Sequence, residues 1–177
     1  MPDQSQLVEF LRQLREGGSN TSPRMECGGY ALERYQARVY VLPDFARNNS
    51  RDSVPEVVGL KLAQTIDIPG VGSVSFAPAA GRGIQLNPED VLELRWRQGG
   101  ERCRPVGKPY NLRLKKLFQE HDVPPWWRER VPLLYLGEEL LSVGDLWLCE
   151  SSRLVIDASV HRSVWQLHWE RKAAAFD

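Results

Sequence analysis

The sequence has few of the features that mark a metal site, a secreted scaffold or a membrane protein. Its 177 residues include only three cysteines, Cys27, Cys103 and Cys149, with no Cys-x-x-Cys pair. This spacing favours reduced cysteines over a disulfide framework or a zinc site. The apolar runs are too short to span a bilayer, and the first residues, Met-Pro-Asp-Gln-Ser-Gln, lack the basic and apolar regions of a secretory signal. We therefore expect a soluble, cytoplasmic chain without a membrane or a metal.

Motifs of complete catalytic sites are also missing. The glycines at 70–72 and 81–83 lack the Lys-Ser/Thr ending of a phosphate loop and the spacing of a dinucleotide fingerprint. His161 and His168 are an odd number of residues apart, so they would lie on opposite faces of a strand. Asp157, His161 and a serine could form a triad, but no nucleophile-elbow pattern accompanies them. We expect no catalytic residue and no cofactor in this chain; a small hydrolase that uses His161 or His168 stays open as an alternative.

Charge, in contrast, is distributed very unevenly. The net charge is zero, yet residues 95–130 contain ten Lys or Arg against four Asp or Glu, which gives this stretch a net charge of about +6. Between Arg102 and Lys116 there is no acidic residue at all. An imbalance of this kind indicates a polyanionic partner such as nucleic acid. The alternative is a solvated face of mixed ion pairs.

The hydrophobic pattern predicts an α+β fold of short antiparallel strands with a few helices. It predicts helices over 3–16, 111–121 and 125–130, and strands over 30–35, 38–42, 66–68, 72–76, 83–86, 91–97, 131–136, 140–143, 146–148 and 164–169. Asp3 and Asn111 are expected to cap the first two helices, and residues 43–55 to form a polar loop. The alternation in 91–97 assigns Leu92, Leu94 and Trp96 to the core. We place a domain boundary near Asn87–Pro88.

The basic segment provides the candidate binding residues. On a helical wheel Leu114, Leu117, Phe118 and His121 share the buried face of the helix, whereas Lys115 and Lys116 point outward. The start of this helix would favour an anion as well. Long cationic side chains on a rigid frame are what phosphate contacts require. The predicted phosphate-binding residues are Arg102, Arg104, Lys108, Arg113, Lys115, Lys116, Arg128 and Arg130. Trp127 could stack on a base or act as a hydrophobic anchor.

Several short runs in this region resemble a known family. They are Arg97-Gln-Gly-Gly-Glu-Arg102, Arg104-Pro105, Leu114-Lys-Lys-Leu-Phe-Gln-Glu120, Val123-Pro-Pro-Trp126, Arg128-Glu-Arg130, Pro132-Leu-Leu-Tyr135, Gly137-Glu-Glu-Leu140 and Leu146-Trp147. Their order and spacing resemble the C-terminal domain of tRNA(Ile)-lysidine synthetases. Leu32-Glu-Arg-Tyr35 and Val39-Tyr-Val-Leu-Pro43 resemble the region that precedes this domain.

The resemblance implies a fold similar to a domain of phenylalanyl-tRNA synthetase β subunits, and a role in gripping tRNA. The full enzyme would use ATP to activate the wobble cytidine of isoleucine tRNA, which lysine then attacks. Its catalytic domain carries a Ser-Gly-Gly-x-Asp-Ser loop, and that motif does not occur here. We therefore expect a C-terminal piece of a longer ligase, with ATP and lysine as substrates of the full enzyme only; a short natural protein that has lost the catalytic half is the alternative.

On this interpretation residues 1–87 are a connecting region, formed by the tail of a helical domain and β-hairpins, and 88–177 are the tRNA-binding domain. One departure concerns Gly107-Lys108, where the family often has Gly-Arg; a lysine lacks the bidentate phosphate geometry of arginine. The expected partners are tRNA(Ile) and the missing N-terminal catalytic domain, and the sequence leaves open whether the chain forms a homodimer. An autonomous β-rich module that binds a ligand or protein through Tyr30, Tyr35 and Tyr40 is the alternative function.

Overall fold

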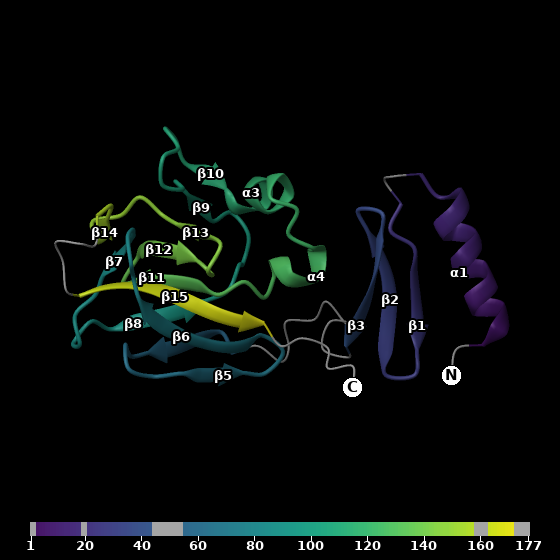
Figure 1. Cartoon of the computed structure of the whole chain (residues 1–177), viewed down its shortest axis with the longest axis horizontal. Coiled ribbons are helices and arrows are strands. Elements are labelled where there is room, and N and C mark those ends of the chain that lie inside the picture. Colours follow the sequence, from purple (N-terminus) through teal and green to yellow (C-terminus); the bar gives the residue numbers. More distant parts are fainter. Residues whose placement is uncertain (1–2, 19–20, 44–54, 158–162, 172–177) are drawn as a thin grey trace. The chain divides into compact units, whose positions relative to one another are not determined.

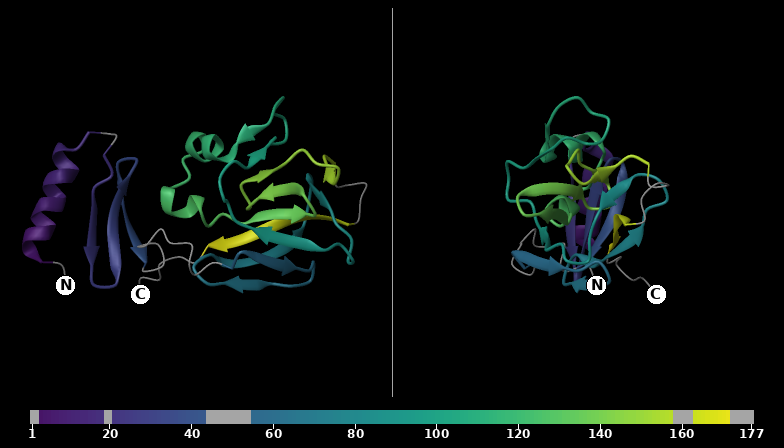
Figure 2. Two further views of the ribbon diagram at one scale, coloured as in Figure 1. Left: turned by 180° about the vertical axis from the view of Figure 1, so that it is seen from behind. Right: turned by 90° about the vertical axis from the view of Figure 1, so that its left-hand side faces the viewer.

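The chain divides into two compact units, one formed by residues 1–50 with 173–177 and the other by residues 51–172. The computed structural model (Figures 1 and 2) describes residues 3–18, 21–43, 55–157 and 163–171. The polar loop expected at 43–55 falls largely outside these ranges. In the part of the chain that is described, no helix is long and apolar enough to cross a membrane.

Unit 1 consists of one helix and a three-stranded antiparallel sheet. Its elements are α1 (Gln4–Glu16), β1 (Arg24–Cys27), β2 (Tyr30–Tyr35) and β3 (Arg38–Pro43), with the strands in the order β1-β2-β3. Asp3 caps α1 as predicted, because its carboxylate accepts a hydrogen bond from the amide of Ser5 at 3.4 Å. The predicted hairpin between β2 and β3 is confirmed, with both turn residues, Gln36 and Ala37, at positive φ.

Unit 2 is built on two five-stranded antiparallel sheets. The first has the order β13-β12-β11-β8-β4, formed by Trp147–Leu148, Glu139–Val143, Leu133–Leu136, Leu92–Arg95 and Val57–Leu60. The second has the order β14-β7-β15-β6-β5, formed by Leu154–Val155, Gly83–Gln85, Val164–Arg171, Gly72–Pro78 and Ile66–Ile68. A ribbon of β9 (Arg102–Cys103) and β10 (Leu112–Arg113) leads into the helices α3 (Leu114–Glu120) and α4 (Pro125–Arg128). The predicted α+β class of short antiparallel strands with few helices is confirmed.

One hydrophobic core joins both sheets and α3. It contains Leu92, Leu94 and Trp96, which the alternation assigned to the core and which are at most 2% exposed. From the second sheet come residues such as Val74 and Trp169. Because side chains from both sheets and the helix interdigitate in one cluster, the basic ribbon and α3 are attached to a well-packed frame.

The compact units do not divide at Asn87–Pro88, and this expectation needs correction. Strand β4 lies before that point and pairs with β8 after it, from Val57↔Arg95 to Leu60↔Leu92. Strand β6 likewise pairs with β15 along seven residues. Backbone hydrogen bonds thus join the segments on either side of 87 into the same sheets, which local composition does not reveal.

Candidate nucleic-acid interface

The basic segment folds into a short ribbon with a loop at its end. Arg102 lies opposite Arg113, and Cys103 lies opposite Leu112. Residues 104–111 form the loop between these strands. Within it, the amide of Lys108 donates to the carbonyl of Pro105 at 2.9 Å, and Gly107 has a φ of +84°. This turn requires a residue that adopts positive φ at its third position, which explains the glycine.

The loop is tied to the segment that follows β13. The amide of Val106 donates to the Leu148 carbonyl at 3.1 Å, and the amide of Glu150 donates to the Arg104 carbonyl at 2.7 Å. Pro105 and Cys149 form an isolated antiparallel bridge. The backbone of the basic loop therefore has a fixed platform beneath it.

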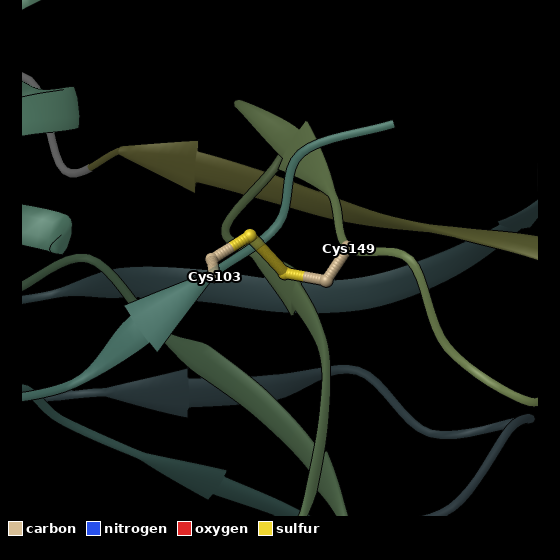
Figure 3. Close-up of a disulfide and its surroundings, with 2 residues drawn as sticks. All are labelled: Cys103 and Cys149. Atoms are coloured by element: carbon tan, nitrogen blue, oxygen red, sulfur yellow. A yellow bond between two sulfur atoms is a disulfide. The ribbon is translucent and has the colours of Figure 1, made fainter. Parts of the chain in front are cut away.

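A disulfide joins Cys103 to Cys149 at the same place (Figure 3), with their Cα atoms 5.8 Å apart. The expectation that all cysteines are reduced is therefore wrong for this pair, and only Cys27 is free. The two cysteines are 46 positions apart. No spacing rule could have paired them, because the β9–β10 ribbon meets the 148–150 segment only in three dimensions.

Helix α3 displays the two lysines as the wheel predicted. Leu114, Leu117 and Phe118 are completely buried, whereas Lys115 and Lys116 are exposed. The prediction was wrong for His121, which is exposed at the C-cap of the helix. Phe118 also packs against Trp147, with ring centroids 5.6 Å apart. The buried face holds the helix in place, so the position of both lysines is determined by the core.

The start of α3 differs from the expectation. The helix begins at Leu114 and its N-cap residue is Arg113, so Asn111 does not cap it. The amide of Leu114 already donates to the carbonyl of Glu101 at 3.0 Å. The pairing of β10 with β9 extends the chain up to Arg113 and delays the helix, and we place no anion at this helix start.

Six exposed cations gather on this ribbon, loop and helix, and we call them the basic surface: Arg102, Arg104, Lys108, Arg113, Lys115 and Lys116. Two of them have weak ion pairs, Arg104 with Glu150 at 3.9 Å and Lys116 with Glu120 at 3.5 Å. The other four form no ion pair with any residue that the structure describes. Exposed pairs of this kind contribute little, so the basic surface keeps most of its positive charge.

The arginines that precede the basic surface in the sequence are paired with carboxylates. Their charge is therefore neutralised, and the basic surface begins after them. Arg95 pairs with Glu93 at 2.8 Å, and a hydrogen bond from Arg95 to this carboxylate raises the pKa of Arg95. Arg97 pairs with Glu129. The excess charge of the 95–130 stretch is therefore concentrated between residues 102 and 116.

The remaining predicted site residues lie apart from the basic surface, around α4. Arg130 is 2% exposed, donates to the Trp126 carbonyl at 2.8 Å, and has a pKa lowered by burial. The half-buried Arg128 donates to the Val123 carbonyl at 2.7 Å. Trp127, also half-buried, packs edge-on against Trp169 with ring centroids 5.5 Å apart. The structure uses all three in packing or backbone contacts, and we leave them out of the proposed contact set.

The glycine clusters and histidines are not assembled into a site among the described residues. Gly70 lies in the turn from β5 to β6, Gly72 is the first residue of β6, and a side chain at Gly83 would come within 2.8 Å of the Trp165 carbonyl. Both clusters thus serve tight turns and close strand packing. His168 is exposed on β15, while His161 lies outside the described residues. No three His, Cys, Asp or Glu side chains of the described ranges gather as they would around a metal ion.

Comparison with known proteins gives the family of this framework. The model of the TilS substrate C-terminal domain matches residues 92–169, which include the whole basic surface. This region of the chain is similar to the C-terminal domain of lysidine synthetases. The match runs from the start of β8 into β15 and so includes the larger part of the core of unit 2.

Similar whole proteins are considerably longer than this chain. The tRNA(Ile)-lysidine synthase of Coxiella burnetii is 28% identical over 152 residues, covering 85% of this chain and 33% of that protein. That of Edwardsiella ictaluri is 27% identical over 175 residues, covering 97% of this chain and 37% of that protein. The chain thus spans about a third of the length of these curated relatives. A solved TilS C-terminal domain aligns with 67% of this chain at 18% identity and a TM-score of 0.49.

Proposed function

We propose that this chain is the tRNA-binding C-terminal part of an ATP-dependent ligase that converts the wobble cytidine of isoleucine tRNA to lysidine. In this proposal the chain positions tRNA and is not catalytic by itself. ATP and lysine are substrates at the catalytic domain of the parent enzyme, which acts in the cytoplasm.

The observation that carries this proposal is the uncompensated charge of the basic surface. Four of its six cations have no ion-pair partner in the described part of the chain, and all six are exposed. Arg102 and Arg113 lie directly opposite each other across the ribbon, where like charges destabilise strand pairing. A phosphate group close to both arginines would relieve that repulsion.

The scaffold suits recognition of a backbone rather than of bases. Lys115 and Lys116 project from a short helix whose other face is completely buried. Cations at defined positions on such a frame contact phosphates and fix the register of the RNA, without reading its sequence. The chain would thus contribute affinity and orientation, and the choice of nucleotide would be made elsewhere in the parent enzyme.

The test is binding of the chain to an unmodified tRNA(Ile) transcript across a salt series, for the wild type and for Lys115→Ala/Lys116→Ala. Each neutralised phosphate contributes roughly −0.7 to −0.9 to the slope of log K against log salt. If both lysines contact phosphates, the double variant should have a slope shallower by about 1.5 and a correspondingly lower affinity at low salt.

A matched control removes the same charge elsewhere in unit 2. Lys61→Ala/Arg82→Ala also deletes two exposed cations, both outside residues 102–116, and should keep the slope of the wild type. Equal slopes for both double variants would contradict the proposed interface. Absence of binding at low salt by the folded wild-type chain would contradict tRNA binding by this part alone and would favour a protein-interaction module.

A further inference from the structure

Two buried cysteines lie at the base of the basic loop. Cys103 is the last residue of β9 and is 2% exposed; Cys149 follows β13 and is 3% exposed. Figure 3 shows their disulfide bridging the two chain segments. The third cysteine, Cys27, belongs to unit 1 and is buried and free.

The disulfide lies in the same small area in which the basic loop contacts the segment after β13. Arg104, which carries one of the exposed charges, follows Cys103 directly. Glu150 follows Cys149, and its amide donates to the Arg104 carbonyl while its carboxylate lies 3.9 Å from the Arg104 guanidinium. The same carboxylate accepts a long hydrogen bond of 3.4 Å from the amide of Gly107. The covalent bond therefore joins the loop to its platform at the same place as these noncovalent contacts.

The charges of the loop oppose its closed form. The ribbon has only two residue pairs, Leu112↔Cys103 and Arg113↔Arg102, and the second places two arginines face to face. From Arg102 to Lys116 the chain contains no carboxylate that could offset them. A two-stranded ribbon of this length is marginal by itself, so we expect a crosslink at its base to reduce how often the loop opens.

We propose that Cys103 and Cys149 form a thiol–disulfide lock that holds residues 104–111 in their RNA-binding arrangement when oxidised and lets the loop open when reduced. The inference rests on the proposed tRNA-binding function for its consequence, but the lock can be measured without RNA. Oxidation preorganises Arg104 and Lys108, and a preorganised site loses less conformational entropy on binding.

The chemistry is an exchange with a small disulfide such as oxidised glutathione. The thiolate of one cysteine attacks a sulfur of that disulfide and releases one glutathione thiol; the second cysteine then attacks the mixed disulfide and releases the other. Two protein thiols are thus oxidised, one glutathione disulfide is reduced to two thiols, and the two protons pass to the leaving thiolates. Because both cysteines are almost completely buried, each attack requires the loop to open.

The first experiment compares tRNA binding by the oxidised and the reduced wild-type chain at one salt concentration. Peptide mapping should first confirm a Cys103–Cys149 link in the oxidised sample. The oxidised form should bind a tRNA(Ile) transcript about three- to tenfold more tightly, the range expected from ordering one or two long side chains. Cys27→Ser should keep this difference, and Cys149→Ala should bind like the reduced form under both conditions.

Thermodynamic linkage provides a second measurement. Its result would show no effect of tRNA if the disulfide had only a structural role. If oxidation increases the affinity for tRNA by a given factor, bound tRNA must shift the thiol–disulfide equilibrium toward the disulfide by the same factor. The ratio of oxidised to reduced chain in a glutathione buffer should therefore rise about three- to tenfold when saturating tRNA is added.

Hydrogen exchange separates failure of the lock from failure of tRNA binding. The amide of Val106, which donates to Leu148 in the loop platform, should exchange faster after reduction, whereas the amide of Ala79, which donates to Val164 in the second sheet, should not. Equal exchange at Val106 in both redox states, a sample in which the link never forms, or equal and measurable tRNA affinities of the two forms would each overturn the lock. If neither form binds tRNA but Val106 responds, the lock stands and the proposed function fails.

Discussion

The guanidinium of Arg130 lies inside unit 2, although the two residues before it in the sequence are charged. Its side chain is 2% exposed and donates to the carbonyl of Trp126 at 2.8 Å. A buried carbonyl that loses its donor keeps the full cost of its desolvation. The same residue type, 17 positions earlier at Arg113, is exposed and makes no ion pair with a described residue. Burial, and not residue type, separates structural from binding arginines in this segment.

We therefore expect Arg130→Ala to lower the free energy of unfolding by about 2–4 kcal/mol, from the lost hydrogen bond and the cavity left behind. Arg113→Ala should change it by less than about 0.5 kcal/mol, as exposed substitutions usually do. Urea unfolding of both variants measures this difference. The salt slope of tRNA binding should respond in the opposite order, becoming shallower for Arg113→Ala only. A shallower slope for a folded Arg130→Ala would show that Arg130 reaches the RNA.

At the scale of elements, hairpin β11–β12 contacts the platform beneath the basic loop, since the amide of Cys149 donates to the Leu141 carbonyl at 2.9 Å. Glu139, the first residue of β12, accepts hydrogen bonds from the amide and hydroxyl of Ser152 at 2.7 and 2.6 Å. These bonds lower the pKa of Glu139. A carboxylate with a lowered pKa in the folded state stabilises the fold above its unfolded pKa, and this contribution is lost as the pH falls through the folded value.

Replacement of Glu139 by Gln should therefore lower the stability near pH 7 by roughly 0.5 kcal/mol, a small value because the group is largely solvated. The difference from the wild type should shrink as the pH falls below the ordinary range of a glutamate and vanish in strong acid. Glu138→Gln, at a 93% exposed side chain in the same turn, is the control. Urea unfolding at several pH values measures both, and a difference that does not change with pH would refute the role of the Glu139 charge.

At the scale of the whole molecule, the two sheets of unit 2 draw strands from both sides of residue 87. A chain that begins at residue 88 lacks β4, β5, β6 and β7, and so lacks the partner along which β15 forms seven residue pairs. It also loses the completely buried Val71, Val74 and Leu86 from the core. A chain that begins at residue 55 keeps both sheets and the disulfide.

We expect the chain 55–177 to unfold in one cooperative thermal transition, with well-dispersed amide resonances in its NMR spectrum. The chain 88–177 should show neither property, because its remaining strands expose core residues that have no partner. Circular dichroism melting curves of the two chains decide between the boundary near residue 50 and the one near residue 87. Cooperative unfolding of the chain 88–177 would instead support the boundary near residue 87.

Local patterns predicted most elements of this fold, since they depend on neighbours along the chain, but they missed the short strands β1, β4, β9, β10 and β14. The alternation of Leu92, Leu94 and Trp96 identified a core strand, and the adjacent β-rich runs over 30–35 and 38–42 identified the hairpin β2–β3. The spacing of Leu114, Leu117 and Phe118 identified the buried face of α3, and thereby the outward direction of Lys115 and Lys116. The uneven charge located the basic surface, because a run without carboxylates is visible in the sequence.

Features that depend on contacts between residues far apart in the sequence were decided by the tertiary structure alone. The start of α3 at Leu114 follows from the pairing of Arg113 with Arg102, and the domain boundary follows from the pairing of β6 with β15. Burial removed Arg130 from the surface, and the fold brought Cys103 within 5.8 Å of Cys149 (Cα to Cα) across 46 positions. In each case the energy of a residue depends on partners far along the chain, which composition and periodicity do not encode.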